Sequence, residues 1–434
     1  MANSKDLSLK ELLNLGLIPN IADEETMKSV DMTMDNTYSN LMEYEEWRDK
    51  TKKAVRYGIK VNKNNPNPYA RITYLYDAVG MTPAKMNYNT NKFEYGSWED
   101  VWFVRKNRPV VLNYDGTEAY ELNPNDYSKK LDGTDSGIND FSLSGNVMSR
   151  IPLVYVSMWE DSSYEYYVVS NVKYDETYKA IAHTTETGAV KDNIYLSVYE
   201  GSTDGTRVRS ISGKDIMHSM TAEQEITRAK DNGSSWYTRT WGQRMLINIL
   251  LMIMSKSDNS QEAFGNGVTN TYNASASMHG MVSTGTLNDK GQFFGYNDET
   301  HAMKVFHIEN WWGNQWERIA GLILDYGKLK ATFTGPYNLD GSGYEDVGIT
   351  YNNSWFSGWQ SLIKVTKAGR FPVEFNGSSN TYTSDYFWSD NSAVKYALVG
   401  GDCSHGFSCG SWYLTLNDPT SSASWHVGAS ISYV

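Results

Sequence analysis

The sequence is poor in cysteine, in clustered positive charge and in long apolar runs. Two cysteines in 434 residues exclude a disulfide framework, although one bridge or two free thiols would both fit the count. The net charge of −12, without a Lys/Arg cluster, argues against nucleic acids and anionic membranes as partners. The longest mainly apolar run, Met245 to Met254, is far shorter than the roughly 20 residues that cross a bilayer, so we expect no membrane insertion.

Strong motifs for catalysis or metal binding are also missing. The sequence has no H-E-x-x-H, no G-x-S-x-G, no pair of C-x-x-C units and no phosphate-binding loop. His301 and His307 are the nearest metal-like set, and we interpret them as structural or surface residues. The run DGSGYED from Asp340 is predicted to be a turn, with a calcium-binding loop as the weaker alternative because its acidic spacing misses the usual pattern. A two-carboxylate glycosidase is not excluded by the pattern but has no positive support.

The chain is long enough for two or more folded units, because a single core stops growing at about 250 to 300 residues. Residues 1–56 are charged and poor in glycine, and their apolar spacing predicts two amphipathic helices that act as an anchor or oligomerisation segment. An ordinary packed helix is the alternative for the second. Residues 1–20 lack a basic start followed by an unbroken apolar stretch, so we expect no secretory signal.

The remaining residues are predicted to be β-rich, with some helix. Residues 57–145 alternate short strands and turns, as in a small β-rich domain, and residues 146–434 form a third unit. In that unit Thr221 and Gln224 form a capping box, and TWGQRMLINILLMIMSKS predicts a buried helix. Beyond Ser257 the chain is rich in loops, interrupted by short aromatic strands such as SDYFWSD. The predicted fold class is therefore α+β.

Several motifs, taken in order, resemble those of a known group of proteins. They are TYLYDAVGMTPA (73–84), RPVVLNYDGTEAYELNPNDYSKKLDG (108–133), GNVMSRIPLVYV (145–156), ITRAKDNGSSWYTRTW (226–241), HIENWWGNQWERIAGL (307–322) and VGGDCSHGFSCGSWYLTLNDPTSSASWHVGAS (399–430). The chain resembles bacteriophage virion proteins of the tail-fibre or receptor-binding kind that end in a C-type-lectin-like domain related to the formylglycine-generating-enzyme fold. The resemblance implies a C-type-lectin-like receptor-binding domain over residues 146–434.

The resemblance places the ligand surface on the C-terminal segment. Turns or close backbone approach would be supplied by Gly400, Gly401, Gly406, Gly410 and Gly428. Trp412 and Trp425 would anchor the segment to the core. The expected ligand-binding residues are Asp402, Ser404, His405, Phe407, Ser408, Ser411 and Tyr413. Small polar and aromatic residues of this kind suit a binding surface, and an ordinary polar loop is the alternative.

Cys403 and Cys409 leave two further interpretations open. The two cysteines could close a small loop by a disulfide. Alternatively, their thiolates and the imidazole of His405 could hold a soft metal such as copper. The formylglycine-generating enzymes hold copper with two cysteines near the C-terminus. Here five residues separate the cysteines, one more than in that family, and the surrounding segment matches the binding version. We therefore expect no enzyme and no cofactor, with calcium left open.

These observations predict a protein of the virion, in a tail or head appendage, that binds a bacterial surface receptor, with a glycan as the expected receptor. Residues 1–56 would contact other virion proteins. A homotrimer is expected, because weak single sites become effective when several copies engage together. The alternative is a structural head-fibre, collar or decoration protein without a host-receptor role.

Overall fold

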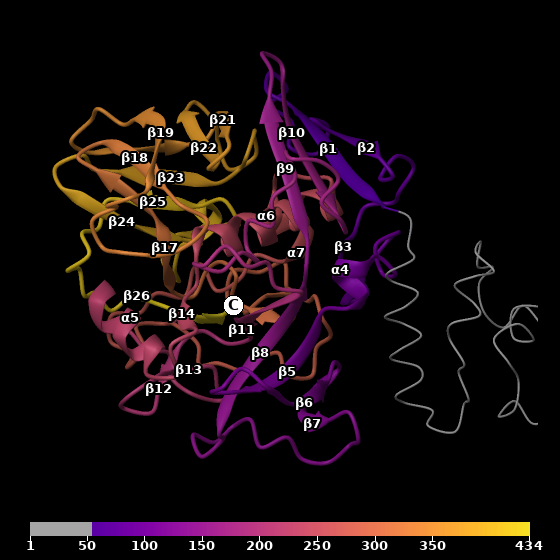
Figure 1. The fold of residues 1–434 in the computed structure, drawn as a ribbon, viewed down its shortest axis with the longest axis vertical. Helices are drawn as coiled ribbons and strands as arrows, with labels where there is room; N and C mark the ends of the chain where they lie inside the picture. Colours follow the sequence, from indigo (N-terminus) through magenta and orange to yellow (C-terminus); the bar gives the residue numbers. More distant parts are fainter. Residues whose placement is uncertain (1–53) are drawn as a thin grey trace, which may run out of the picture. The chain divides into compact units, whose positions relative to one another are not determined.

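The computed structural model describes residues 54–434, which are drawn in colour in Figure 1. Contacts between Cα atoms divide the chain into two units, Met1–Ala54 and Val55–Val434, and all described residues except Ala54 belong to the second. The predicted helical anchor of residues 1–56 therefore lies outside the described residues, apart from its last three positions, of which Arg56 begins the first strand.

Strands dominate the described residues, so the predicted α+β class is wrong. Residues 54–434 contain strands β1–β27 but only four α-helices, α4–α7, and just one of these is longer than nine residues. The region beyond Ser257, predicted to be loop with a few strands, holds β15–β27. Its aromatic and β-branched residues pair across strands that are often only two to four residues long. Such short runs carry too little periodicity to be recognised one by one.

Two antiparallel sheets hold most strands of the first half. The four-stranded sheet has the order β2-β1-β10-β9, and the seven-stranded sheet has the order β14-β27-β11-β8-β5-β6-β7. These strands are β1 (Arg56–Asn62), β2 (Ile72–Tyr76), β5 (Arg108–Asn113), β6 (Glu118–Asn123), β7 (Asp126–Lys130), β8 (Gly145–Pro152), β9 (Tyr155–Glu160), β10 (Tyr164–Ser170), β11 (Asn193–Ser197), β14 (Trp236–Thr238) and β27 (Ile431–Tyr433). The boundary predicted at residue 145 falls at the start of β8, which pairs with β5 before it and β11 after it.

An eight-stranded mixed sheet holds most strands of the second half. Its order is β19-β18-β17-β24-β25-β23-β20, with β26 beside β17. The strands are β17 (Trp316–Asp325), β18 (Lys328–Ala331), β19 (Glu345–Thr350), β20 (Phe356–Trp359), β23 (Tyr386–Ser389), β24 (Val394–Val399), β25 (Leu414–Leu416) and β26 (Val427–Gly428). The two-stranded pairs are β3 (Lys85–Asn87) with β4 (Lys92–Glu94), β12 (Ser202–Thr203) with β13 (Val208–Arg209), β15 (Lys304–Val305) with β16 (Ile308–Glu309), and β21 (Leu362–Thr366) with β22 (Gly369–Glu374).

The two helices predicted in this region are confirmed. Helix α5 (Ala222–Lys230) begins at the capping box of Thr221 and Gln224. Helix α6 (Trp241–Ser255) has a second capping box and buries every residue. The two shorter helices are α4 (Trp102–Arg105) and α7 (Ser260–Phe264). Within residues 54–434, no helix combines the length and the apolar character needed to cross a membrane.

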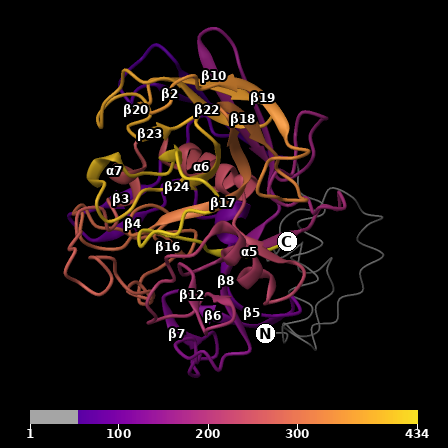
Figure 2. The same cartoon turned by 90° about the vertical axis from the view of Figure 1, so that its left-hand side faces the viewer.

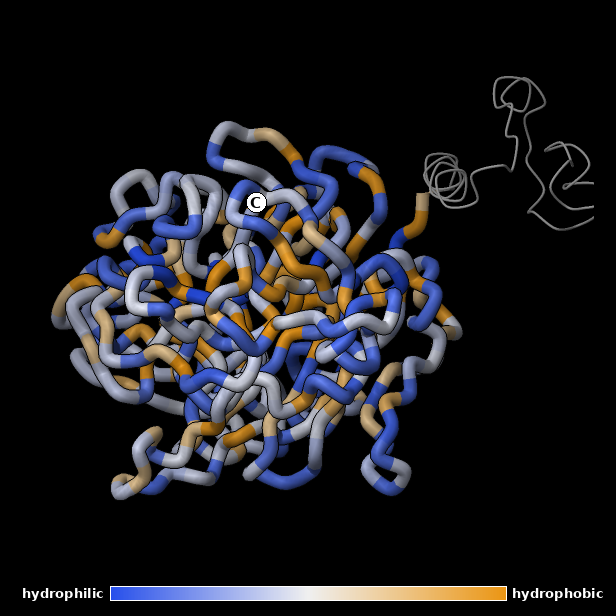
Figure 3. The backbone as a smooth tube through the Cα atoms, turned by 90° about the horizontal axis from the view of Figure 1, so that it is seen from below, coloured by the Kyte–Doolittle hydropathy of each residue, from blue (hydrophilic) through white to orange (hydrophobic). Residues whose placement is uncertain are grey.

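Helix α6 forms the centre of the largest apolar cluster. It contacts β17 of the eight-stranded sheet and β1 and β10 of the four-stranded sheet. Figures 1 and 2 show it between these sheets in two perpendicular views. In Figure 3 the apolar stretches, in orange, gather inside the body, while the outer loops are mainly polar. The helix therefore gives both sheets, and the segment between β24 and β27, a common rigid support.

Candidate functional site

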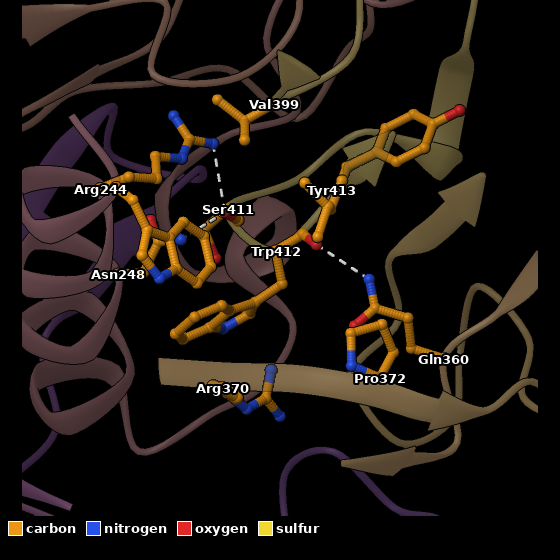
Figure 4. Close-up of a pocket in the computed structure, with 11 residues that line it drawn as sticks. Arg244, Asn248, Gln360, Arg370, Pro372, Val399, Ser411, Trp412 and Tyr413 are labelled. Carbon is orange, nitrogen blue, oxygen red and sulfur yellow. Dashed lines mark hydrogen bonds between the residues drawn. The ribbon is translucent and has the colours of Figure 1, made fainter. Parts of the chain in front are cut away.

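The C-terminal segment, residues 400–430, is fastened to α6 by buried polar side chains. Arg244 Nη2 and Asn248 Nδ2 donate hydrogen bonds to the carbonyl oxygen of Ser411, at 3.1 and 2.5 Å. Arg244 Nη1 also donates to the carbonyl of Trp311 at 2.6 Å, which ties the helix to a second loop. Figure 4 shows these side chains converging on the backbone of the segment. Because all these groups are buried, the bonds fix the position of Ser411 on the helix.

Trp412 anchors the segment on its other side, as expected. Its indole is buried beneath the guanidinium of Arg370, 4.4 Å from the ring centroid. Its backbone N–H donates to Asp385 Oδ2 at 2.6 Å, and its carbonyl accepts from Gln360 Nε2 at 2.8 Å. The cavity among these residues measures about 10 Å³, about the space of one water molecule. Trp425 is only half-buried and packs against the rings of Tyr272 and His279.

Two of the expected glycines are required by their surroundings. Gly401 has φ +85°, and a Cβ there would overlap Cys409 Sγ. Gly410 has φ +157°, and a Cβ there would overlap the carboxylate of Asp385. Both positions therefore need a residue without a side chain, for conformation and for space. The segment follows one tightly fitted path across the body.

The structure buries three of the seven expected ligand-binding residues, so the prediction that they are exposed is wrong for these. Asp402, Ser411 and Tyr413 are each at most 3% exposed. Asp402 turns inward because its carboxylate accepts hydrogen bonds from its own neighbours, Ser404 and His405. Ser411 lies under α6, and the ring of Tyr413 packs in the main core.

The other four expected residues share one outward turn. Phe407 is 56% exposed, Ser404 is also exposed, and His405 and Ser408 are half-buried. Residues Gly406–Ser408 form a single 3-10 turn, which carries the phenyl ring of Phe407 away from the body. We call Ser404, His405, Phe407 and Ser408 the outer turn. It is the part of the predicted surface that a ligand could reach.

Asp402 is the electrostatic centre beneath the outer turn. Its Oδ1 lies 2.7 Å from His405 Nδ1, while its Oδ2 is buried without a hydrogen-bond partner, 3.7 Å from His426 Nδ1. Burial opposes ionisation of Asp402, but hydrogen bonds from His405 and Ser404 outweigh it and hold the pKa of the carboxyl below its usual value. Burial lowers the pKa of His426, and the nearby carboxylate of Asp402 partly offsets this. The carboxylate therefore orients the imidazole of His405.

The two cysteines are free, buried thiols in the structure. Burial, with a smaller contribution from Asp402, raises the pKa of Cys403 to about 12, and the same causes raise the pKa of Cys409 well above its usual value. Metals and electrophiles react with the thiolate, and both thiols are protonated at neutral pH. Within residues 54–434, no group of three or more His, Cys, Asp or Glu side chains is placed to hold a metal ion.

The other metal-like candidates have structural surroundings. His307 is buried, and its Nδ1 is hydrogen-bonded to the hydroxyl of Tyr127. His301 is exposed and pairs with Asp298, so the two histidines have different partners. The run from Asp340 is a turn, as predicted, in which Asp340 Oδ1 accepts the N–H of Ser342 at 2.9 Å.

A second buried carboxyl lies beneath the end of the segment. Glu200 Oε2 accepts hydrogen bonds from Asn310 and Asn314, at 2.8 and 2.6 Å. It lines a cavity of about 10 Å³ whose other walls include Gly428, Ala429 and Ser430. Burial raises the pKa of Glu200 to about 8, against the opposing effect of the two amide donors. The carboxyl is therefore largely protonated at neutral pH.

The sequence predicted an aromatic strand within SDYFWSD but not the row of aromatic side chains to which it belongs. We call this row the aromatic strip: Trp355 just before β20, Trp359 on β20, and Tyr386 and Trp388 on β23. Neighbouring ring centroids are 5.7 Å apart for Trp355 and Trp388, 5.6 Å for Trp388 and Tyr386, and 5.2 Å for Tyr386 and Trp359. The aromatic run from Tyr386 to Trp388 was the available signal, and the structure shows that half-buried and buried residues alternate along β23, as in a strand with one outward face.

The aromatic strip joins the C-terminal segment through the backbone pairing of β23 with β25 and through one side-chain hydrogen bond. Trp388 Nε1 donates to the hydroxyl of Tyr413 at 2.8 Å, and the ring of Tyr413 lies 5.7 Å from that of His405. No family model matches the sequence, and no curated protein matches it either. The roles of these residues are therefore inferred from their own chemistry and from the motif resemblance.

Proposed function

We propose that the protein is a bacteriophage virion component that binds a receptor on the host surface, a glycan, through its C-terminal segment. The observation that carries this proposal is the contrast within the segment. Its backbone is held by Arg244, Asn248 and Asp385, while the outer turn exposes Ser404 and the ring of Phe407 to solvent. A surface that is already rigid loses little conformational entropy when a ligand binds.

The chemistry of the outer turn also favours binding over catalysis. Phe407 offers an aromatic face, and Ser404 and Ser408 offer small hydroxyl groups, which is a composition that suits recognition. The thiols of Cys403 and Cys409 are protonated, and the carboxylate of Asp402 is engaged by His405 and Ser404. The resemblance to receptor-binding virion proteins points the same way. As part of the proposal, several copies, as a homotrimer, act together on one cell, attached to the virion through residues 1–56.

Adsorption of phage to host cells tests the proposal. The purified full-length protein is added to cells of the strain that the phage infects, and free phage is counted after mixing. The protein should compete with the phage, and the double variant His405→Ala, Phe407→Ala should compete at least tenfold less well. Tyr326→Ala removes another exposed ring, 68% exposed against 56% for Phe407, from a turn after β17 and serves as the control. If the wild-type protein does not compete and is located on the capsid, a structural head-fibre, collar or decoration role replaces this proposal.

A further inference from the structure

The aromatic strip presents its rings on the outward side of a sheet edge. Strand β20 is the last strand of the eight-stranded sheet, and its register with β23 sets Ser357 opposite Trp388 and Trp359 opposite Tyr386. Trp355 precedes β20 and is 60% exposed, and the other three rings are half-buried. The rings are tilted by 54° to 86° from one neighbour to the next, so the surface offers both ring faces and ring edges.

The inward side of the same strands holds these rings in place. Phe387 lies between Tyr386 and Trp388 in β23, is fully buried, and packs against Tyr351 and Phe375 with centroids 4.9 Å away in both cases. Phe375 in turn packs against Phe356 of β20, at 4.6 Å. Rings that are positioned before a ligand arrives bind it with little loss of side-chain entropy.

The absence of charged side chains on β20 and β23 restricts the kind of ligand that the strip can bind. Strands β20 and β23 read FSGW and YFWS, and none of these side chains carries a charge. The chain as a whole has a net charge of −12, which repels anionic ligands at a distance. Two hydroxyls lie beside the rings: the hydroxyl of Tyr386 lies 3.3 Å from Ser357 Oγ. An uncharged ligand with apolar faces and a hydroxylated rim matches this surface.

We propose that the aromatic strip binds an uncharged glycan made of pyranose units, as a site separate from the outer turn. A pyranose ring has C–H groups on its faces and hydroxyl groups around its rim. The negative face of an aromatic ring attracts such C–H groups as it attracts the edge of another ring. Trp355 and Trp388 take the sugar faces, and the hydroxyls of Ser357 and Tyr386 take the rim. This inference rests on the proposed function, because it names the class of glycan and adds contacts beside the outer turn.

Binding of defined oligosaccharides tests the strip directly. The full-length protein is titrated with maltohexaose, cellohexaose, mannohexaose and chitohexaose, and with hexagalacturonate as the charged comparison, by calorimetry and tryptophan fluorescence. At least one uncharged hexasaccharide should bind, and the charged one should bind more weakly. Trp355→Ala should weaken that binding about 2- to 10-fold, and Trp388→Phe, which keeps a ring, should weaken it less. Trp159→Ala is the matched control, since that indole is 40% exposed and lies on β9.

Three results would overturn the inference: no uncharged hexasaccharide binds, hexagalacturonate binds as tightly, or Trp355→Ala and Trp388→Phe bind like the wild type at unchanged melting temperature. A change of oligomeric state in Trp355→Ala would instead assign the strip to a second copy of the chain, which also overturns it. If the protein competes with phage for host cells but binds no oligosaccharide, the strip is not a glycan site and the proposed function stands. If Trp355→Ala weakens oligosaccharide binding but the wild-type protein does not compete with phage for host cells, the strip is a glycan site and the proposed function is wrong.

Discussion

The outer turn and the aromatic strip are neighbours that are built in opposite ways. In the segment that carries the turn, polar groups are used internally: the carboxylate of Asp402 accepts hydrogen bonds from Ser404 and His405. In the strip, paired strands hold the backbone and the side chains are left facing outward. The difference shows that the polar groups of a loop can form hydrogen bonds within the loop itself. In a half-buried strand, by contrast, every second side chain faces outward and is accessible to a partner.

The strongest test of this difference is to replace one tryptophan by alanine in each region and to compare the losses of stability. Trp412→Ala removes a buried indole and should lower the free energy of unfolding by about 3 to 5 kcal/mol. Trp355→Ala removes an exposed indole and should change it by no more than about 0.5 kcal/mol. Urea denaturation followed by circular dichroism measures both. Equal losses would mean that the strip is part of the core rather than a surface.

A pair of glycine substitutions separates crowding from backbone strain. Gly410→Ala should cost about 3 kcal/mol, because a Cβ there meets the buried carboxylate of Asp385 in addition to the strain at φ +157°. Gly343→Ala, at φ +79° with no atom within 4 Å of the new Cβ, should cost about 1 kcal/mol from strain alone. Melting temperatures of the two variants give the comparison. Similar shifts would show that Asp385 can move aside.

The pH dependence of stability should report on the base of the C-terminal segment. In the folded protein Glu200 has a pKa of about 8, above its usual value, so the folded state holds a proton that the unfolded chain has already lost. The contribution of Glu200 to stability should therefore be largest below about pH 4.5 and fall by up to about 1.4 kcal/mol per pH unit until pH 8.

Glu200→Gln isolates that contribution. The amide cannot lose a proton, so the wild type should lose stability relative to this variant as the pH rises from 5 to 8. Thermal unfolding of both proteins across that range measures the difference. A difference that stays constant with pH would show that Glu200 is ionised in the folded protein at neutral pH.

The smallest expected effect concerns the side-chain hydrogen bond between Trp388 and Tyr413, which adds to the backbone pairing of β23 with β25. Trp388→Phe and Tyr413→Phe each remove one partner of this bond, and the double variant removes both. A double-mutant cycle should give a coupling energy of about 1 kcal/mol, typical of a single hydrogen bond. Chemical denaturation of the four proteins supplies the numbers. A coupling near zero would mean that this bond adds no stability to the pairing of β23 with β25.

Long, strongly patterned elements could be predicted from the sequence, and the short strands could not. Thr221 with Gln224, and the apolar run from Met245, identified α5 and α6 because local rules decide capping and burial there. The strands after Ser257 depend on partners far along the chain, as when β17 pairs with β24 and β26. Those distances in sequence are invisible to any local pattern.

The candidate site divides in the same way. The need for glycine at positions 401 and 410, and the anchoring role of Trp412, could be predicted from residue type. The burial of Asp402 could not be predicted from its polarity, although Asp402 followed two residues later by Ser404 is a common turn pattern. The state of Cys403 and Cys409 depends on tertiary packing. Trp355 and Trp388 meet only because β20 pairs with β23.

The pairing of β27 with β14 and β11 also sets the order of events during synthesis. These two strands have no direct contact in the sheet order, and β27 lies between them. A ribosome must therefore have made residues 431–433 before the seven-stranded sheet can close. The outer turn lies between β24 and β25, and β25 pairs with β24 and β23, so the turn is held at both ends once residues 414–416 have been made. A chain that stops before β25 cannot hold the outer turn at both ends, and one that stops before β27 cannot close the seven-stranded sheet.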